Sequence, residues 1–347
     1  MKSRILVGMS GGIDSTFAVK RLIERGFAPE GAVLIMHDSS PVAEAERAAE
    51  SLGIVLHKVD CREAFKNAVE ALLVSEYAKG RTPNPCVVCN SEIKFKYLAE
   101  TARKLGIERI STGHYVRVEY NRDTDRYEML SASDTKKDQS YFLWRVGQSE
   151  LEMFENVLDL ESKESVKRAL LESGIVHESN ESQEICFIPD GERVDYIKSR
   201  MTPEERESAF CEGNFVNTSG EPIGRHRGLA FYTPGQRKGL GIALGRPAYV
   251  LRVVPERNEV VLGFEEDNVC TSFTASDVRF VSEAPFEGEI VCFVRVRHRG
   301  ALRKAKVAVK DKKCKISLEI SEKTVSAGQS AVFYDEKGRV LFGAYID

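Results

Sequence analysis

The first third of the chain alternates short apolar runs with segments in which apolar residues recur every three or four positions. A short apolar run predicts a strand, and the longer spacing predicts a helix with one buried face. Strands that alternate with helices favour a parallel sheet covered on both faces. The strands are expected at 5–7, 32–36, 54–59 and 109–112, and the helices at 15–25, 42–52, 62–78 and 92–105.

The pattern changes further along the chain. Two alternating runs at 115–120 and 126–131 flank a polar turn and predict a hairpin, and a helical region is expected at about 150–173. Residues 201–224 show little periodicity, so we place a domain boundary there. Beyond it, short β-branched runs predict an all-β region, either a barrel or two small β modules. These runs are 248–254, 259–262, 289–296, 304–309, 315–320, 330–334 and 340–345.

Length and composition are typical of a soluble globular protein with more than one domain. At 347 residues the chain exceeds one ordinary core, so two or three domains are expected. No apolar run approaches the length of a membrane span. The apolar run at 5–9 is short and leads into a glycine-rich turn, which does not fit a signal peptide. We therefore expect a cytoplasmic protein whose eight cysteines are free thiols rather than a disulfide framework.

Charge is unevenly distributed along the chain. The net charge of −3 argues against a nucleic-acid partner at first sight. Residues 295–315, however, hold ten Lys or Arg against one acid, whereas residues 151–172 are acid-rich. A local basic surface is enough to bind phosphates, although most such runs are solvated strand faces.

A glycine-rich turn follows the first predicted strand and opens the first helix. Small residues let the backbone approach a polyphosphate, and free amides at a helix start favour anionic oxygens. The spacing lacks the Gly-Lys-Ser/Thr of a Walker A loop and the G-x-G-x-x-G of a dinucleotide fold. It resembles instead the PP-loop of ATP pyrophosphatases, which grip the pyrophosphate released when an acceptor is adenylated. The turn comprises Gly8, Met9, Ser10, Gly11, Gly12, Ile13, Asp14 and Ser15.

Two further residues are expected beside this turn. Met36 ends the second strand and Gly113 follows a later one, so both belong at the carboxyl edge of the sheet, where ligands bind. Topology places them on either side of an adenine, although each residue taken alone is more often a packing residue.

Three cysteines have unusual neighbours. Cys86 and Cys89 form a C-x-x-C pair in 82–90, which we interpret as a rigid loop before a helix, and Cys186 lies in 182–189. A C-x-x-C pair alone indicates half of a zinc site or a redox pair, but the sequence lacks a second pair at similar spacing. The remaining cysteines are expected to pack as small apolar side chains; they are Cys61, Cys211, Cys270, Cys292 and Cys314.

Over nearly its whole length the sequence resembles the tRNA-specific 2-thiouridylase family. Seven motifs occur in the family's order, beginning with the glycine-rich turn at 8–15. The others are 80–85 with 89–90, 92–95, 112–115, 137–143, 182–188 and 228–241. The resemblance implies an α/β fold with a parallel-sheet PP-loop (HUP-like) nucleotide-binding domain, a small β-rich central domain and a C-terminal β-barrel. We place these domains at 1–200, 201–268 and 269–347, and expect the last to contact tRNA.

The resemblance also implies a substrate and residue roles. The target is the wobble uridine of tRNA, with lysine, glutamate and glutamine acceptors expected, and a sulfur-donor protein delivers a persulfide. The glycine-rich turn, Met36 and Gly113 bind ATP with Mg²⁺. Cys186 carries the persulfide, and Cys89 forms a disulfide with it. The residues implied against the target base are Asn84, Pro85 and Cys86, and those against the tRNA are Lys137, Asp138, Gln139, Arg297 and His298.

These roles fit the chemistry of uracil. The C2 oxygen is a poor leaving group, and adenylation converts it into AMP, which leaves readily. A thiolate or persulfide then attacks C2. A second cysteine forms a disulfide with the carrier and frees the thiocarbonyl. This interpretation requires Cys89 and Cys186 to converge beside the phosphate-binding turn.

The sequence departs from the family pattern at several positions. Cys86 stands where many relatives have Asp, and His298 stands where Tyr is usual. The endings at 327–329 and 341–344 are also looser than the family's. Three thiolates, Cys86, Cys89 and Cys186, open a second mechanism in which they hold a four-iron four-sulfur cluster whose free iron carries sulfide. We prefer the persulfide route and leave the cluster open.

Two other classes of protein compete with this interpretation. Another PP-loop enzyme that adenylates a small molecule would keep the nucleotide turn but would not need Cys89, Cys186 or a basic β-domain. A non-catalytic iron–sulfur or RNA-binding protein would not need residues 10–15 in this arrangement. His114 and Trp144 are expected to be structural rather than catalytic.

Overall fold

The computed structural model of the protein describes residues 2–173, 185–189 and 191–347. Its N-terminal part is built on a four-stranded parallel sheet in the order β3-β2-β1-β4. The strand order reverses at β1, because β2 pairs with one edge of it and β4 with the other. Ligands of such sheets bind at this reversal, outside the carboxyl ends of the strands. The strands are β1 (Arg4–Gly8), β2 (Ala28–Ile35), β3 (Leu56–Asp60) and β4 (Ile110–Thr112).

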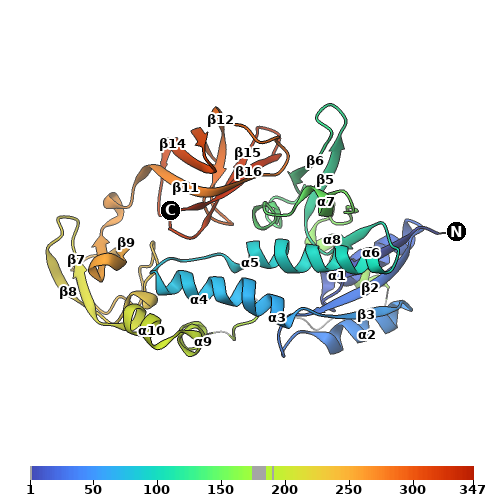
Figure 1. The fold of residues 1–347 in the computed structure, drawn as a ribbon, viewed down its shortest axis with the longest axis horizontal. Helices are drawn as coiled ribbons and strands as arrows, with labels where there is room; N and C mark the ends of the chain where they lie inside the picture. Colours follow the sequence, from blue (N-terminus) through green and yellow to red (C-terminus); the bar gives the residue numbers. More distant parts are fainter. Residues whose placement is uncertain (1, 174–184, 190) are drawn as a thin grey trace.

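Helices cover both faces of this sheet (Figure 1), as the sequence predicted. Successive side chains of a strand point to opposite faces. Ile5 and Val7 of β1 therefore pack against α1 (Ile13–Glu24) and α2 (Val42–Leu52), whereas Leu6 packs against α6 (Lys96–Lys104). These three β1 residues are fully buried, which explains why the strand is continuously apolar.

Two longer helical runs lie side by side below the barrel in Figure 1. Each contains a π-helical turn, a feature that occurs often at functional sites. The first run joins α3 (Arg62–Phe65), η1 (Lys66–Glu70) and α4 (Ala71–Ala78); the second joins α5 (Pro85–Val88), η2 (Cys89–Phe95) and α6.

The second run begins well before residue 92, where periodicity placed its start, so the loop expected at 82–90 is wrong from residue 85 onward. The reason is local capping. The side-chain oxygen of Asn84 accepts the backbone N–H of Cys86 at 3.2 Å, and Pro85 occupies the first helical position, where its missing N–H costs nothing.

The helical region expected at about 150–173 is helical only in part. The structure has two helices, α7 (Gln148–Leu151) and α8 (Lys163–Glu172), with an irregular segment between them. That segment follows the edge of the sheet instead of coiling: Ile110 N–H donates to Met153 at 2.8 Å, and Glu155 N–H donates to Ile110 at 2.9 Å. The predicted hairpin is present as β5 (Val116–Asn121) and β6 (Arg126–Ser131).

The central part combines two helices with a four-stranded sheet in the order β8-β7-β10-β9. Residues 201–224, which lack periodicity, contain a helix, a strand and the start of a second strand. That helix starts at a capping box between Thr202 and Glu205, with Pro203 at its first position, and so does not depend on an apolar stripe. The elements are α9 (Arg193–Arg200), α10 (Pro203–Phe210), β7 (Gly213–Val216), β8 (Pro222–His226), β9 (Tyr249–Val254) and β10 (Glu259–Gly263).

The C-terminal part is a closed barrel in the order β11-β14-β13-β12-β15-β16. Alternate residues point inward, so Ala305, Val307 and Val309 are buried while lysines of the same strand face outward. The α/β fold with a terminal barrel confirms the predicted fold class. The strands are β11 (Cys270–Phe280), β12 (Gly288–Arg295), β13 (Arg303–Lys310), β14 (Lys313–Glu322), β15 (Ser330–Tyr334) and β16 (Val340–Ile346). Short 3₁₀ turns elsewhere are η3 (Ser140–Phe142), η4 (Leu229–Phe231), η5 (Pro255–Arg257) and η6 (Glu265–Asp267).

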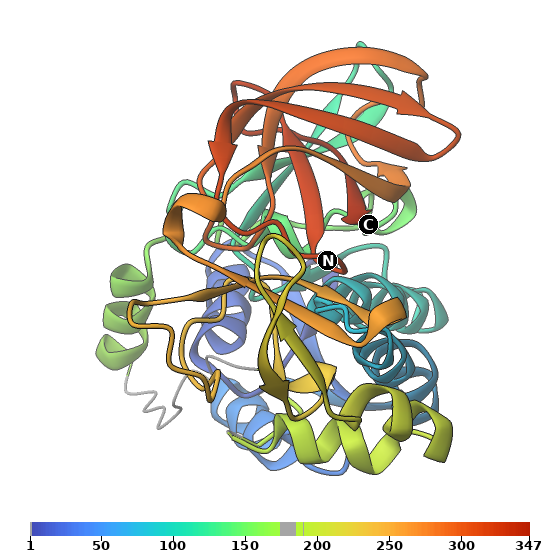
Figure 2. The same cartoon turned by 90° about the vertical axis from the view of Figure 1, so that its left-hand side faces the viewer.

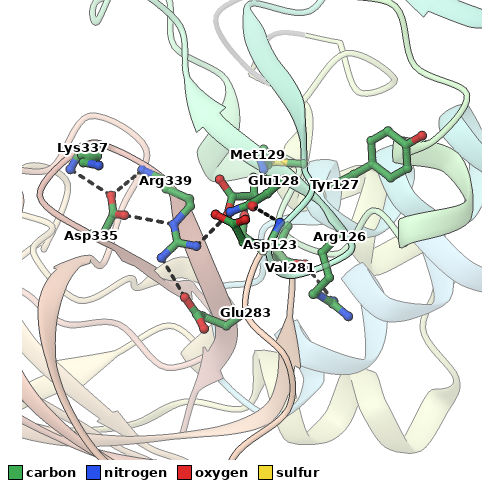
Figure 3. A network of polar contacts seen from close by, with 12 residues as sticks. Asp123, Arg126, Tyr127, Glu128, Met129, Val281, Glu283, Asp335, Lys337 and Arg339 are labelled. Carbon is green, nitrogen blue, oxygen red and sulfur yellow. Dashed lines mark hydrogen bonds and ion pairs between the residues drawn. The ribbon is translucent and has the colours of Figure 1, made fainter.

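The barrel sits above the parallel-sheet part, with the central sheet in front of both in Figure 2. Arg339 links the barrel to the β5–β6 hairpin by hydrogen bonds (Figure 3). Its guanidinium donates to Glu128 of β6 at 2.8 Å, to Glu283 at 2.7 Å and to Asp335 at 3.0 Å. Within the described residues, no helix is long and apolar enough to cross a membrane.

Candidate active site

The glycine-rich turn lies between the end of β1 and the start of α1. Gly11 has a φ of +69°, and a Cβ there would come within 2.3 Å of the Glu44 backbone, so both conformation and space require glycine. The Ser15 hydroxyl accepts the backbone N–H of Ser10 at 3.2 Å and folds the turn back onto the helix. The first turn of α1 therefore opens toward the sheet edge, where its free amides favour an anion.

A cavity of about 360 Å³ opens over this turn. All of the predicted ATP-binding residues except Gly11 line it. Gly113 is needed here because a Cβ would come within 2.8 Å of the Ser15 backbone nitrogen. The lining comprises Gly8, Met9, Ser10, Gly12, Ile13, Asp14, Ser15, Met36 and Gly113, together with Ala32, Val33, Leu34, Pro41, Lys94, Leu98, Thr112, His114, Gln139 and Lys163.

A lysine that sequence reasoning missed completes one end of the cavity. Lys163, the first residue of α8, is buried, and its Nζ lies 2.9 and 2.8 Å from the two carboxylate oxygens of Asp14. The Tyr115 hydroxyl donates to one of these oxygens at 2.8 Å. Asp14 is thus held from two sides. Lys163 stands in the acid-rich stretch at 151–172, and no motif marked it.

The C-x-x-C pair lies on the helical run beside the cavity, with Cys86 on α5 and Cys89 on η2. Cys89 is buried, and its Sγ lies 3.7 Å from Sδ of Met36, which lines the cavity. Burial raises the pKa of the Cys89 thiol to about 12 and also raises the pKa of Cys86. Both thiols are therefore protonated near neutral pH in this arrangement.

Cys186 is exposed. Its neighbours Ile185 and Phe187 pack in the same apolar cluster as Cys89. The adjacent Phe187 anchors it, because its ring packs edge-on against Phe65 at a centroid distance of 4.9 Å. Burial is the main cause of the raised pKa of Cys89. The charge of Lys94 opposes this rise, and negative charge on Cys186 adds to it. The sulfurs therefore lie within electrostatic reach of each other. Residues 182–184 of the same motif lie outside the described residues.

One cation faces both the thiols and the cavity. Lys94 is half-buried on η2 and lines the cavity wall. Its charge opposes the rise in the pKa of Cys86 and Cys89. Burial, helped by Lys94, lowers the pKa of His114 to about 3, so this imidazole is neutral at ordinary pH. His114 bonds to Thr112 Oγ1 through Nδ1 at 2.8 Å, which agrees with a structural role.

The three cysteines do not form a metal site in this arrangement. Across residues 2–173, 185–189 and 191–347, no three His, Cys, Asp or Glu side chains are placed to hold a metal ion. Cys86, Cys89 and Cys186 all belong to these ranges, so their geometry does not fit the set of thiolates that an iron–sulfur cluster needs.

Comparison with known proteins assigns the family. The family model described as tRNA methyl transferase HUP domain matches residues 3–190. The tRNA methyl transferase PRC-barrel domain matches 204–264, and the aminomethyltransferase beta-barrel domain matches 270–346. The tRNA-specific 2-thiouridylase MnmA 1 of Clostridium botulinum is 38% identical over 362 residues, covering 100% of this chain and 99% of the relative. The chain belongs to the tRNA-specific 2-thiouridylase family.

Other comparisons agree to different degrees. The tRNA-specific 2-thiouridylase MnmA 2 of Clostridium tetani is also 38% identical, over 100% of this chain and 99% of its own length. A solved structure of a tRNA methyltransferase subunit from Methanocaldococcus jannaschii is 15% identical and covers 49% of this chain and 75% of that chain. Its TM-score of 0.30 is too low to add to the assignment. The family membership confirms the resemblance found in the sequence.

In this 2-thiouridylase, the residues expected to contact tRNA lie where the barrel meets the catalytic part. Asp138 is buried, and its Oδ2 accepts from Arg295 of the barrel at 3.2 Å. Gln139 lines the nucleotide cavity and accepts the Tyr115 backbone N–H at 2.9 Å. Lys137 is half-buried and engaged in a contact within the protein. Asp138 therefore joins two domains, a role that sequence reasoning missed.

The two expected contacts from the barrel lie at the same junction. Arg297 is half-exposed and pairs with the buried carboxylate of Glu322 at 3.2 Å. His298 stacks on Phe142 with a centroid distance of 4.3 Å, and its Nδ1 is buried without a hydrogen-bond partner among the described residues. The junction thus presents a guanidinium and an aromatic stack beside the catalytic part.

Proposed function

We propose that this protein is a tRNA 2-thiouridylase that adenylates the C2 oxygen of the wobble uridine and replaces that oxygen with sulfur. The observation that carries the proposal is the 3.7 Å contact between Cys89 Sγ and Met36 Sδ. It joins the thiol group to the wall of the nucleotide cavity. A site that activates a carbonyl and then attacks it with sulfur needs these two functions side by side.

In the first half-reaction ATP occupies the cavity with its phosphates over the start of α1. The uridine O2 attacks the α-phosphorus, the bond from that phosphorus to the bridging oxygen breaks, and pyrophosphate leaves. The base loses its N3 proton, so C2 is now bound to AMP. Asp14 is the carboxylate of the cavity lining. Together with the phosphates it would hold Mg²⁺, which neutralises phosphate charge, once Lys163 releases one of its oxygens.

In the second half-reaction the terminal sulfur of a Cys186 persulfide attacks C2. The bond from C2 to oxygen breaks and AMP leaves. The Cys89 thiolate then attacks Sγ of Cys186, which breaks the S–S bond and forms a disulfide between the two cysteines. The electron pair of the broken bond stays on the base sulfur, N3 regains a proton, and the thiocarbonyl is released. An external dithiol must reduce the disulfide before the next turnover.

The arrangement of the thiols favours this persulfide route over a cluster. Cys186 is exposed and open to a sulfur-donor protein, whereas Cys89 is buried beside the cavity. This difference suits a carrier that is loaded from outside and a partner that acts after transfer. Because Cys86, Cys89 and Cys186 do not assemble into a metal site, no step is assigned to iron.

The barrel supports RNA as the substrate. Lys310 on β13 and Lys313 and Lys315 on β14 are exposed and form no ion pair within the described part of the chain. Unpaired surface lysines bind phosphates without reading sequence. We therefore place tRNA along the barrel with its wobble uridine at Asn84, Pro85 and Cys86, and expect acceptors for lysine, glutamate and glutamine. We place the reaction in the cytoplasm.

The test is a reconstituted reaction with ATP, unmodified tRNA and a persulfide donor, in which pyrophosphate and 2-thiouridine are measured separately. Cys186→Ser is expected to abolish 2-thiouridine while tRNA-dependent pyrophosphate release continues. Cys211→Ser, which changes an exposed cysteine on another surface, should leave both products unchanged. A Cys186→Ser protein that still makes 2-thiouridine would refute its role. ATP cleavage that does not need tRNA would favour a small-molecule acceptor.

A further inference from the structure

We propose that Lys94 is a catalytic cation shared by both half-reactions, holding the α-phosphate of the nucleotide on one side and the attacking sulfur on the other. This inference rests on the proposed function and adds a residue to it. Lys94 belongs to the motif at 92–95 and follows Cys89 by five residues, but nothing in the sequence assigned it a role of its own.

The nucleotide side of the proposal follows from the cavity lining. Two lysines line the cavity, Lys94 and Lys163. Both contacts of the Lys163 ammonium described above go to Asp14, so its charge is largely compensated. Within the described residues Lys94 forms no ion pair with a carboxylate, although it is half-buried. A partly buried cation without a counter-ion is poised for an anionic ligand.

The position of Lys94 on the wall places it at the α-phosphate rather than at the leaving pyrophosphate. Lys94 lies on the same helical run as Leu98, and both residues line the cavity. Leu98 in turn lies beside the strand ends at Gly8 and Thr112. Pyrophosphate is expected at the start of α1, where Lys163 bonds to Asp14. Lys94 therefore faces the part of the nucleotide that stays attached to the base as AMP.

The sulfur side follows from the π-helical turn. Cys89 and Lys94 are the first and sixth residues of η2. An α-helix has 3.6 residues per turn, so five residues make more than one full turn. Two residues five positions apart therefore point in different directions. In a π-helix the hydrogen bonds run between residues five apart, so the two positions lie nearly one above the other. The π-turn thus brings the ammonium onto the face that carries the Cys89 thiol.

The charges of the thiols support this geometry. Burial acts to lower the pKa of Lys94, but Cys89, Cys186 and Cys86 outweigh burial and raise it when they carry thiolate charge. Lys94 is also the cation that opposes the rise in the pKa of Cys86 and Cys89. It therefore remains an ammonium while sulfur and phosphate charges change around it.

The chemistry gives such a cation two tasks. Negative charge builds on the α-phosphate oxygens as uridine O2 attacks and again as AMP departs. A fixed ammonium at those oxygens stabilises both transition states. The same ammonium attracts the persulfide and thiolate that must enter the site, so the sulfur arrives at the carbon to which AMP is attached. One residue then couples activation of the base to its attack.

The test compares Lys94→Met with Lys94→Arg and with Lys96→Met, which changes an exposed lysine of the same helical run. Adenylation is measured as the burst of pyrophosphate when tRNA and ATP are mixed with persulfide-free enzyme. Sulfur transfer is measured as 2-thiouridine formed in one turnover from persulfide-loaded enzyme with tRNA adenylated beforehand. Thermal melting and the KM for ATP report folding and nucleotide binding.

Lys94→Met is expected to slow the burst and the sulfur transfer by about a hundredfold each, as loss of one preorganised donor does in other enzymes. Lys94→Arg should recover part of both rates, and Lys96→Met should match the wild type. A Lys94→Met protein with a wild-type burst overturns the proposal, as does one in which only one of the two steps is slowed. Failure of the proposed function would look different, because the wild-type protein itself would then show no tRNA-dependent burst.

Discussion

Cys89 is a buried thiol that acts as a nucleophile in the mechanism we propose. Burial raises its pKa to about 12, and Lys94 offsets only part of that rise. A thiol is reactive only as the thiolate. In the free enzyme Cys89 is therefore held inactive, which protects it from oxidation and from reacting with the incoming persulfide too early.

This state predicts the pH dependence of alkylation. Below a pKa near 12 the thiolate fraction rises tenfold for each pH unit, so raising the pH from about 7 to about 9 should speed alkylation of Cys89 by about a hundredfold. Iodoacetamide labelling of the free protein under anaerobic conditions, followed by peptide mass spectrometry, measures the rate. The exposed Cys211 serves as the comparison and should react faster at neutral pH. Equal rates for the two thiols at pH 7 would contradict the account.

At the scale of single residues, the sequence predicted those residues that stand in a recognisable local motif. The glycine-rich turn and the three cysteines were found because their spacing has a physical meaning by itself. Lys163 was missed because it lies far from Asp14 in the sequence and stands among acids. Asp138 was interpreted as a tRNA contact, and nothing local indicates its buried pairing with Arg295. Contacts between domains have no local pattern.

At the scale of elements, the site depends on how closely α1 approaches β4. Gly113 follows β4 and packs against the first turn of α1. An added Cβ would come within 2.8 Å of the Ser15 nitrogen and 2.9 Å of the Asp14 carbonyl carbon. Both atoms belong to the backbone and cannot rotate away, so the helix start itself would have to move.

Gly113→Ala is therefore expected to cost about 1–3 kcal/mol of unfolding free energy and to raise the KM for ATP about tenfold. The reason is displacement of the phosphate-binding turn rather than loss of a side chain. Gly147→Ala is the matched control, because its Cβ would meet only the flexible end of the Glu150 side chain. Chemical denaturation and pyrophosphate kinetics test both variants. An unchanged KM in Gly113→Ala would show that the turn tolerates the shift.

The elements themselves were predicted where apolar spacing was regular. α2 and the β5–β6 hairpin lie where periodicity placed them. The helix at Pro85 was placed too late, because its start is fixed by the Asn84 cap and not by an apolar stripe. The π-turn at η2 is invisible to a search for a period of 3.6, although it aligns Cys89 with Lys94. Tertiary packing decides such turns.

At the scale of the whole molecule, the barrel and the catalytic part share one buried junction. Trp144, the only tryptophan of the chain, is buried there and donates to the Ser330 hydroxyl of the barrel at 3.0 Å. The loop that leads to α5 is tied to the barrel as well, since Thr82 N–H donates to Ala327 at 2.9 Å. Docking of the barrel therefore holds the segment that carries the residues we propose to contact the target base.

The charged contact at the edge of this junction provides a test of that coupling. Arg339 is the cation between Glu128, Glu283 and Asp335, and all four side chains are largely buried. Removing the guanidinium takes one hydrogen bond from each of three carboxylates that face one another. Glu128 keeps its bond from Asn121, and Asp335 keeps its bonds from the backbone. A lost bond to a charged group costs about 1.5–3 kcal/mol when no new partner replaces it. These carboxylates are partly exposed, so water replaces some of the three lost bonds and the total cost is smaller than their sum.

Arg339→Met is expected to lower the free energy of unfolding by about 2–3 kcal/mol and to shift Trp144 fluorescence to longer wavelength at denaturant concentrations that leave the wild type folded. Adding Glu283→Gln should recover part of the stability, because it removes one of the repelling charges. Thiolation of tRNA should fall more than ATP binding, since the cavity lies within the catalytic part while the loop before α5 depends on the barrel. The contrary outcome is that the wild-type and Arg339→Met proteins each lose Trp144 fluorescence and activity together, at the same denaturant concentration. The barrel would then not undock separately, and the junction would support the fold without controlling the site.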